Sequence, residues 1–287
     1  MRPGVSLRAS GRTNLRQTLW NHADMATRFH GWPEQAYEVL LKLGGEPSRE
    51  TRERVRRDRE EQVRQPMIDL LSDLADVDPW YEDFAVWRYA STAYWWQNQC
   101  AIVRVARNVE IGFRFNPDGL RIRASWWYAD AEQIALYRAA TAADESGRTL
   151  EESVSSLVAD GHEIRGDVMK RVPRGYPADH PRADLLRHRS LTAACDLESD
   201  AVRDVEPVYR ACERLRPLLD WLTTHTQPAG GGGPSATDQS SSPESSGPPI
   251  SRVSSGSGSR CSPMPASSSN SSSSTAASLK IRPQTTR

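Results

Sequence analysis

The sequence lacks long apolar runs and paired cysteines. None of its apolar stretches approaches the roughly 18 to 20 residues that a membrane-spanning helix needs, and residues 1–24 carry arginines without the apolar segment of a secretory signal. The four cysteines, Cys100, Cys195, Cys212 and Cys261, are widely spaced and form no CxxC pair, which argues against a secreted disulfide scaffold. We therefore expect a cytoplasmic protein with reduced thiols and no membrane partner.

An excess of charge of one sign is also missing. Lys plus Arg and Asp plus Glu number 37 each, so the formal net charge at pH 7 is zero. Such a chain has no global field to hold a nucleic-acid backbone, although local basic patches can still form. Nucleic acid is therefore not an expected partner.

The motifs of common nucleotide-binding and hydrolytic sites are absent. There is no G-x-x-x-x-G-K-[ST], no G-x-G-x-x-G after a strand and no G-x-S-x-G, which these sites require. His162 beside Glu163, and the pair His180 and His188, lack the spacing that puts two metal ligands on one helix face. We expect no metal and no cofactor.

Composition divides the chain into three parts. Residues 1–25 have no clear period and are expected to be a disordered or non-native leader, with Met25 as an alternative start. Residues 26–226 carry the patterns of one folded domain. Residues 227–287 are mostly Ser, Gly and Pro, which bury too little apolar surface to offset a backbone ordering cost of roughly 1 to 2 kcal/mol per residue. A disordered tail is expected there.

The middle of the domain has the alternation typical of strands. Apolar and polar residues alternate over 109–115 and again over 120–126, and Asn116-Pro117-Asp118-Gly119 between them is a turn sequence. We predict a hairpin, with neighbouring strands at 84–90 and 99–106. This gives an antiparallel sheet of roughly four or more strands.

Helical periodicity flanks this sheet on both sides. The second predicted helix carries i,i+4 Glu–Arg pairs and is expected to be a solvated rod. The predicted helices are Pro33 to Leu43, Ser48 to Arg64, a restart from Pro66, Asp130 to Ala140, Thr149 to Gly161, Pro181 to Arg189 and a last one from Pro207, with a further strand at Leu191 to Cys195. Since no βαβ rhythm appears, the fold class is α+β, with helices packed on the sheet.

Three segments carry a family resemblance. FHGWPEQAYEVLLKL at 29–43, WWYADAEQIALYRAA at 126–140 and PRGYPADHPRADLLRH at 173–188 resemble the bacterial family known as domain of unknown function 2461, over roughly residues 28–226. The resemblance implies no established activity. Family members carry an Arg-rich run where this chain has aromatic residues at 87–96, and only Arg88 remains of it.

The Pro-Arg-Gly-Tyr-Pro loop is the first candidate site. Arg174, Tyr176 and His180, with Arg182 and His188 beyond them, could bind a phosphate or carboxylate and move a proton. The alternative is a rigid surface loop whose side chains bind backbone carbonyls.

An aromatic region is the second candidate. Trp95, Trp96 and Trp127, beside arginines on the predicted strands, could stack bases or cage a cation. Alternatively, the rings pack on the sheet and the arginines extend over them toward water. Adjacent indoles on a strand point to opposite faces, so one of them needs a ligand, a helix or a second copy of the chain, as in a homodimer, to cover it. The strand arginines are Arg104, Arg114, Arg121 and Arg123.

These features favour a non-catalytic binding or interaction domain for a small anionic or aromatic ligand or a protein partner. The alternative is an enzyme acting on a phosphorylated or carboxylated small molecule. It would use Arg88 and Arg174 as anion binders and His180 as acid or base, which requires Arg88 and His180 to share a pocket. A third hypothesis is nucleic-acid contact by the arginine-bearing sheet.

Overall fold

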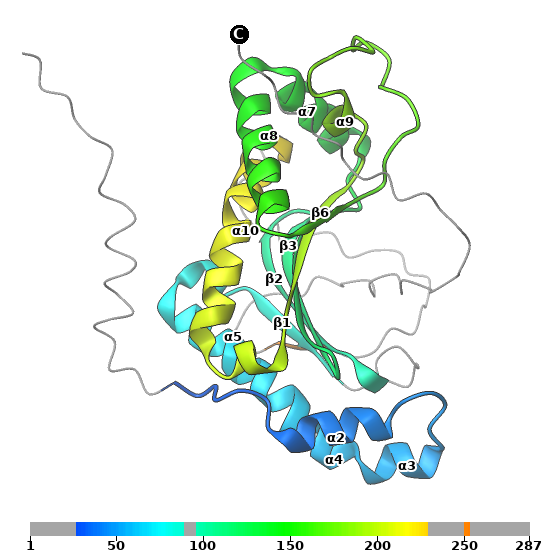
Figure 1. The fold of residues 1–287 in the computed structure, drawn as a ribbon, viewed down its shortest axis with the longest axis vertical. Helices are drawn as coiled ribbons and strands as arrows, with labels where there is room; N and C mark the ends of the chain where they lie inside the picture. Colours follow the sequence, from blue (N-terminus) through cyan, green and yellow to red (C-terminus); the bar gives the residue numbers. More distant parts are fainter. Residues whose placement is uncertain (1–26, 89–95, 229–249, 253–287) are drawn as a thin grey trace, which may run out of the picture.

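An antiparallel sheet forms the centre of the protein, as a computed structural model shows for residues 27–88, 96–228 and 250–252 (Figure 1). Within these residues its strand order is β5-β6-β4-β3-β2-β1-β7, and every neighbouring pair is antiparallel. The α+β class is therefore confirmed. The strands are β1 (Phe84–Trp87), β2 (Gln99–Ala106), β3 (Val109–Asn116), β4 (Gly119–Trp126), β5 (Glu163–Arg165), β6 (Leu191–Leu197) and β7 (Ile250–Arg252).

The predicted hairpin is β3 and β4, which pair from Val109 opposite Trp126 to Asn116 opposite Gly119. The Asn116 side chain accepts a hydrogen bond from the Asp118 amide (3.0 Å), which fixes the turn. Gly119 has φ 123°, and a Cβ there would lie 2.5 Å from the carbonyl oxygen of Leu197. The turn therefore needs glycine at this position.

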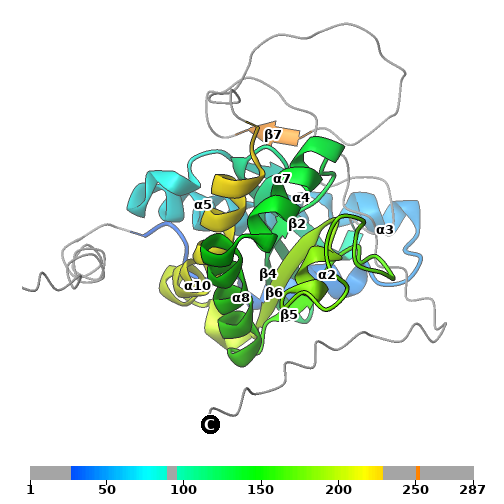
Figure 2. The same cartoon turned by 90° about the horizontal axis from the view of Figure 1, so that it is seen from above.

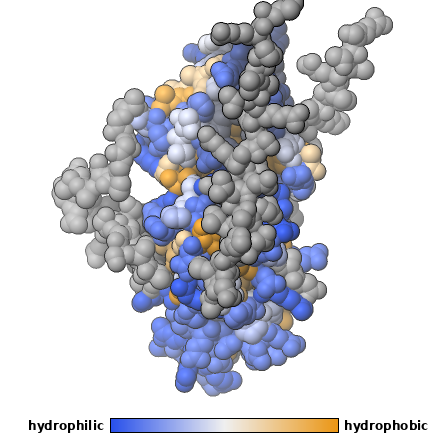
Figure 3. Space-filling model, turned by 90° about the vertical axis from the view of Figure 1, so that its left-hand side faces the viewer, coloured by the Kyte–Doolittle hydropathy of each residue, from blue (hydrophilic) through white to orange (hydrophobic). Residues whose placement is uncertain are grey.

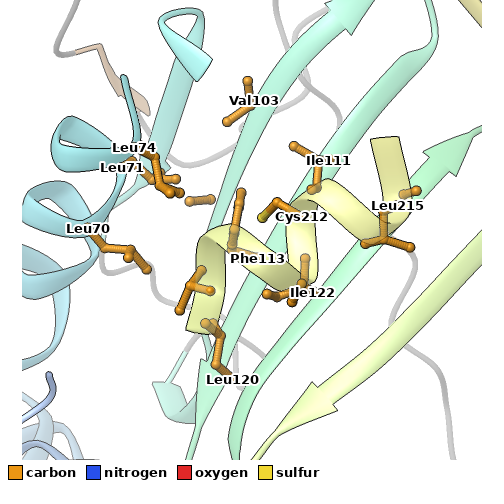
Figure 4. Packing of buried hydrophobic residues seen from close by; sticks show 14 of the residues in the cluster. Leu70, Leu71, Leu74, Val103, Ile111, Phe113, Leu120, Ile122, Cys212 and Leu215 are labelled. Carbon is orange, nitrogen blue, oxygen red and sulfur yellow. The ribbon is translucent and has the colours of Figure 1, made fainter. Parts of the chain in front are cut away.

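Helices α5 (Gln65–Val77), α8 (Asp144–Ala159) and α10 (Val205–Thr226) lie on the same side of the sheet (Figures 1 and 2). Figure 4 shows Leu70 of α5 and Leu215 of α10 facing Phe113 and Ile122 of the central strands. All four of these side chains are fully buried. We call this side the inner face, and it accounts for the apolar half of each alternating strand.

Helices α7 (Ala131–Ala142) and α9 (Ala183–Leu186) pack beside α8 and α10 at one end of the sheet. Asp130 caps α7 as predicted, since its carboxylate accepts the Gln133 amide (2.8 Å). The predicted start of the next helix at Thr149 is wrong. Helix α8 begins at Asp144, and the Thr149 hydroxyl donates to the Glu145 carbonyl one turn earlier (3.0 Å).

The segment predicted as one solvated helix is broken and partly buried. Ser48 caps it as expected, but α3 (Arg49–Arg54) ends at Val55 and α4 (Arg56–Arg59) runs into a π-helix, η1 (Glu60–Arg64). Helix α3 has no buried residue, and the face of α2 (Glu34–Lys42), α3 and α4 seen in Figure 3 is mostly hydrophilic. The π turn directly precedes Pro66, which cannot donate an amide to a regular helix.

Two arginines of this broken helix are nearly inaccessible to solvent. Arg59 is 1% exposed, and its guanidinium donates to the backbone carbonyls of Trp96 (3.3 Å) and Asn98 (3.0 Å) and to the Gln99 side chain (3.0 Å). It therefore satisfies the carbonyls of the segment that leads into β2.

Arg64, 5% exposed, binds the end of β1, which precedes the segment that Arg59 contacts. It donates to the carbonyls of Val86 (3.4 Å) and Trp87 (3.2 Å) at the end of β1, and pairs with Glu60 (2.6 Å). The end of β1 and the start of β2 are thus both held by one helical turn.

Part of the predicted tail forms structure. Ile250–Arg252 is strand β7, with Ala85 opposite Arg252 and Trp87 opposite Ile250 on β1. The rest of the tail from residue 229, and the leader up to residue 26, lie outside the described residues. In the described part of the chain, no helix has the length and apolar character to cross a membrane.

We predict that Arg59→Lys lowers the free energy of unfolding by roughly 2 to 4 kcal/mol, because a lysine cannot reach three acceptors and leaves buried carbonyls unpaired. Urea denaturation measures this. Arg57→Lys is the control, since Arg57 is an exposed side chain on the same helix, and it should leave the midpoint unchanged. An equally small effect of both variants would contradict the anchoring role of Arg59.

Candidate functional site

The sheet face opposite the helices, which we call the outer face, carries most of the strand arginines. The registers of β2, β3, β4 and β6 place its side chains in three rows of four that run across the strands. The rows are Arg104, Glu110, Ser125 and Thr192; Ile102, Gly112, Arg123 and Ala194; and Cys100, Arg114, Arg121 and Asp196.

Two of these arginines are neutralised by acidic neighbours. Arg104 pairs with Asp83 (3.0 Å). Arg121 pairs with Asp196 across the strand (2.7 Å) and with Glu163 of β5. Glu163 has a lowered pKa, since hydrogen bonds to Arg165 and Arg121 outweigh its burial. These two arginines are therefore already occupied by protein carboxylates.

Arg114 differs from them. It lies directly opposite Arg121 on β4, and like charges in this arrangement repel each other. Its Nε atom is buried without a hydrogen-bond partner, and it makes no ion pair within the described ranges. Arg114 is thus a half-buried cation whose charge the described part of the protein leaves uncompensated.

Gly112 lies at the centre of the outer face, between Ile102 and Arg123 in its row and two positions before Arg114. A glycine inside a strand has no side chain to fill the surface and often marks the close approach of another group. Gly112 is buried, as are Ile102 and Ala194 of the same row.

Glu110 and Trp127 form the other part of the outer face. Trp127 donates its indole N–H to Glu110 (3.1 Å), and the Arg123 guanidinium carbon lies 4.1 Å from the centre of the Trp127 ring. Burial raises the pKa of the Glu110 carboxyl, while Arg123, the Trp127 hydrogen bond and Arg104 oppose this shift. Next to Glu110, the buried Ser125 hydroxyl has no hydrogen-bond partner in the described structure.

The sequence predicts Trp127 beside the strand arginines, but it does not single out Glu110, Gly112 or Ser125 as site residues. The alternation along β3 and β4 could have identified them, because all three occupy positions on the polar side of these strands. Only the register across four strands shows that they are neighbours.

Of the other predicted aromatic residues, Trp96 is not brought to Trp127. Trp95 lies outside the described residues. Trp96 is half-buried, with the Arg52 guanidinium 4.6 Å from its ring centre, and precedes the start of β2. The start of β2 lies level with Leu120 of β4, six residues before Trp126. Six residues of strand span roughly 20 Å. Trp96 and Trp127 therefore belong to opposite ends of the sheet.

The Pro-Arg-Gly-Tyr-Pro loop connects β5 to α9. Arg174 is exposed and Tyr176 half-buried, and neither side chain has a hydrogen bond or ion pair within the described residues. Gly175 between them has φ 93°, a left-handed conformation that suits glycine. The Nδ1 atom of His180 accepts a hydrogen bond from the Arg182 amide (3.0 Å). This ring nitrogen is therefore already bonded to the backbone of its own turn.

Arg88 and His180 lie toward different ends of the sheet. Arg88 is exposed and directly follows β1 at the end where β2 begins. His180 precedes α9, whose Leu185 carbonyl accepts the Tyr137 hydroxyl (3.0 Å), and Tyr137 stacks on Trp126 (4.7 Å) at the opposite end. The described structure therefore does not bring these two predicted catalytic partners together.

Arg182 is bound to the backbone at the end of a helix. It is 9% exposed and donates to the carbonyls of Thr141 (2.7 Å), Ala142 (3.0 Å) and Ala143 (3.1 Å), which end α7. A cation at a helix C-terminus is favourable because it satisfies free carbonyls and the helix dipole. The second half of the family-like loop thus fastens α9 to α7.

His188 is also structural. It is 3% exposed, and its Nδ1 atom lies 3.0 Å from the Ser190 carbonyl, to which it donates. Burial lowers the pKa of His188. Among the described residues, no three His, Cys, Asp or Glu side chains gather in a way that could hold a metal ion.

We predict that His188→Asn weakens the loss of stability in acid. The unfolded chain takes up a proton at His188 as the pH falls through about 6.5, whereas the buried ring resists it, so the folded state loses stability below that pH. Asparagine keeps a donor near the Nδ1 position but does not titrate. The fall in melting temperature between pH 7 and pH 5 should shrink in this variant and stay the same in the exposed-site control His30→Asn. Equal falls in all three proteins would refute this role.

Comparisons with known proteins bear on part of the chain. No curated protein and no solved structure matches it. Residues 90–221 match the model of a family described as "Conserved hypothetical protein (DUF2461)". The matched range includes β2 to β6, the outer face and most of α10, and ends five residues before α10 does. The chain therefore resembles the DUF2461 family from β2 through most of α10.

Proposed function

We propose that this protein is a non-catalytic binding domain whose outer face takes a small anionic ligand. The observation that carries the proposal is Arg114, a half-buried guanidinium opposite Arg121 without an ion-pair partner among the described residues. Arginine is suited to such a site because its planar fork matches the oxygens of phosphate and carboxylate groups.

The energetics of this pair support a ligand. Two arginines directly opposite each other on neighbouring strands destabilise a sheet, and Asp196 and Glu163 offset only the charge of Arg121. An anion between the guanidinium groups of Arg114 and Arg123 would supply the missing negative charge.

The enzyme hypothesis is supported by one different observation. Glu110 is a carboxyl with a raised pKa beside Arg123 and Arg104, and perturbed carboxyls of this kind serve as general acids or bases. Its substrate would again be a phosphorylated or carboxylated small molecule. Replacing Glu110 separates the two functions, because it would abolish turnover in an enzyme and strengthen anion binding in a binding domain.

We predict that Arg114→Gln weakens binding of inorganic pyrophosphate at least tenfold, measured by isothermal titration calorimetry. The same variant should raise the free energy of unfolding of the free protein by roughly 0.5 kcal/mol, since it removes the repulsion from Arg121. The control Arg57→Gln changes an exposed arginine far from the outer face and should leave both quantities unaltered.

Unchanged pyrophosphate affinity in Arg114→Gln would remove the basis of the proposal. A protein that ignores pyrophosphate but binds single-stranded oligonucleotides, with affinity that falls steeply as salt rises, would favour the nucleic-acid hypothesis instead.

We also predict that Glu110 makes anion binding depend on pH. The ionised carboxylate faces Arg104, Ser125, Arg123 and Trp127 and competes for the arginines. Because burial raises its pKa, acidification from pH 7 to pH 5 begins to protonate it and should strengthen binding of sulfate, whose own charge is constant in this range. Glu110→Gln should bind sulfate tightly at both pH values. A variant with the pH dependence of the original protein would show that another group is responsible.

A further inference from the structure

Tyr128 has an unusual backbone conformation for an exposed aromatic residue. Its φ is 53°, in the left-handed region, and its side chain is 63% exposed. A bulky residue there is strained, and such strain persists only when the surroundings impose it. Nothing in the packing of the core requires an exposed ring at this position.

A partly buried network of side-chain amides imposes this bend. The Asn108 side chain donates to the Tyr128 carbonyl (3.1 Å) and to the side-chain oxygen of Gln133 (2.7 Å). Gln133 is fully buried and donates in turn to the Arg107 carbonyl (3.2 Å). The Trp127 amide donates to the Asn108 carbonyl (3.2 Å). The chain after β4 is therefore fixed on both sides of the strained residue, and the ring is held out from the sheet.

The ring is next to the proposed anion site. Its centre lies 5.7 Å from that of Trp127, at 30° between the planes, and the Arg123 guanidinium carbon lies 4.1 Å from the Trp127 ring centre. The two distances together place Arg123 within about 10 Å of the Tyr128 ring. Trp127 is itself held by its hydrogen bond to Glu110. An aromatic surface thus continues from the arginines to the exposed tyrosine.

We propose, as a refinement that rests on the proposed function, that the ligand is a nucleoside phosphate. Its phosphate binds Arg114 and Arg123, and its base stacks on Tyr128. Stacking of a base on an aromatic side chain tolerates different bases and adds substantially to affinity. The strained backbone keeps the ring in place before the ligand arrives, so little ordering cost remains at binding.

The test compares three probes by calorimetry: adenosine monophosphate, ribose 5-phosphate, which has the anion without the base, and adenosine, which has the base without the anion. We expect adenosine monophosphate to bind roughly tenfold or more tightly than ribose 5-phosphate, the gain that base stacking supplies. Tyr128→Asn should lose this gain and leave ribose 5-phosphate unchanged, and Tyr128→Phe should keep it. Leu41→Asn is the control, since Leu41 is equally exposed (63%) on α2.

Thermal unfolding shows that the variants are folded. Tyr128→Asn should melt at the same or a higher temperature than the original protein, because asparagine adopts the left-handed conformation more readily. Equal affinity for adenosine monophosphate and ribose 5-phosphate would overturn this inference and leave the anion site standing. Binding of adenosine as tight as that of adenosine monophosphate, or no binding of any phosphate, would overturn the anion site as well.

Discussion

The strict alternation of side chains along β2, β3, β4 and β6 is the constraint on which the rest of the structure depends. Every second residue, Phe113 and Ile122 among them, faces the core under α5 and α10. The pleat then places the residues between them on the outer face. A slip of one residue would exchange the two faces. The register that builds the core therefore also brings Arg114, Gly112 and Glu110 together.

Buried arginines hold the ends of this sheet and join it to the helices. Arg59 and Arg64 bind carbonyls at the start of β2 and the end of β1, and Arg182 binds the carbonyls that end α7. Each satisfies backbone groups that would otherwise be buried without partners. Arginine thus appears in two settings: these three side chains are bound to backbone carbonyls, whereas Arg114 on the outer face has no ion pair among the described residues.

The family-like loop at 173–188 illustrates how a motif can be mainly structural. Arg182 and His188 are buried and bound to carbonyls, which agrees with the interpretation of a rigid loop. Arg174 remains exposed. The features that point to a ligand lie instead on the sheet, in strands whose alternation first identified them as ordinary half-buried β-structure. Tyr128 adds a strained, exposed ring at the end of one of these strands.

The sequence by itself determined the β3–β4 hairpin, the start of α7 at Asp130 and the antiparallel class, because period-two alternation, a turn sequence and a capping residue are local signals. Local signals could not reveal that the helix expected through Arg64 buries its last turn. Nor could they show that Thr149 lies inside α8 or that Glu110 faces Trp127 and Arg123. These outcomes depend on contacts between distant segments, and only the tertiary structure decided which polar side chains found a partner and which, like Arg114, did not.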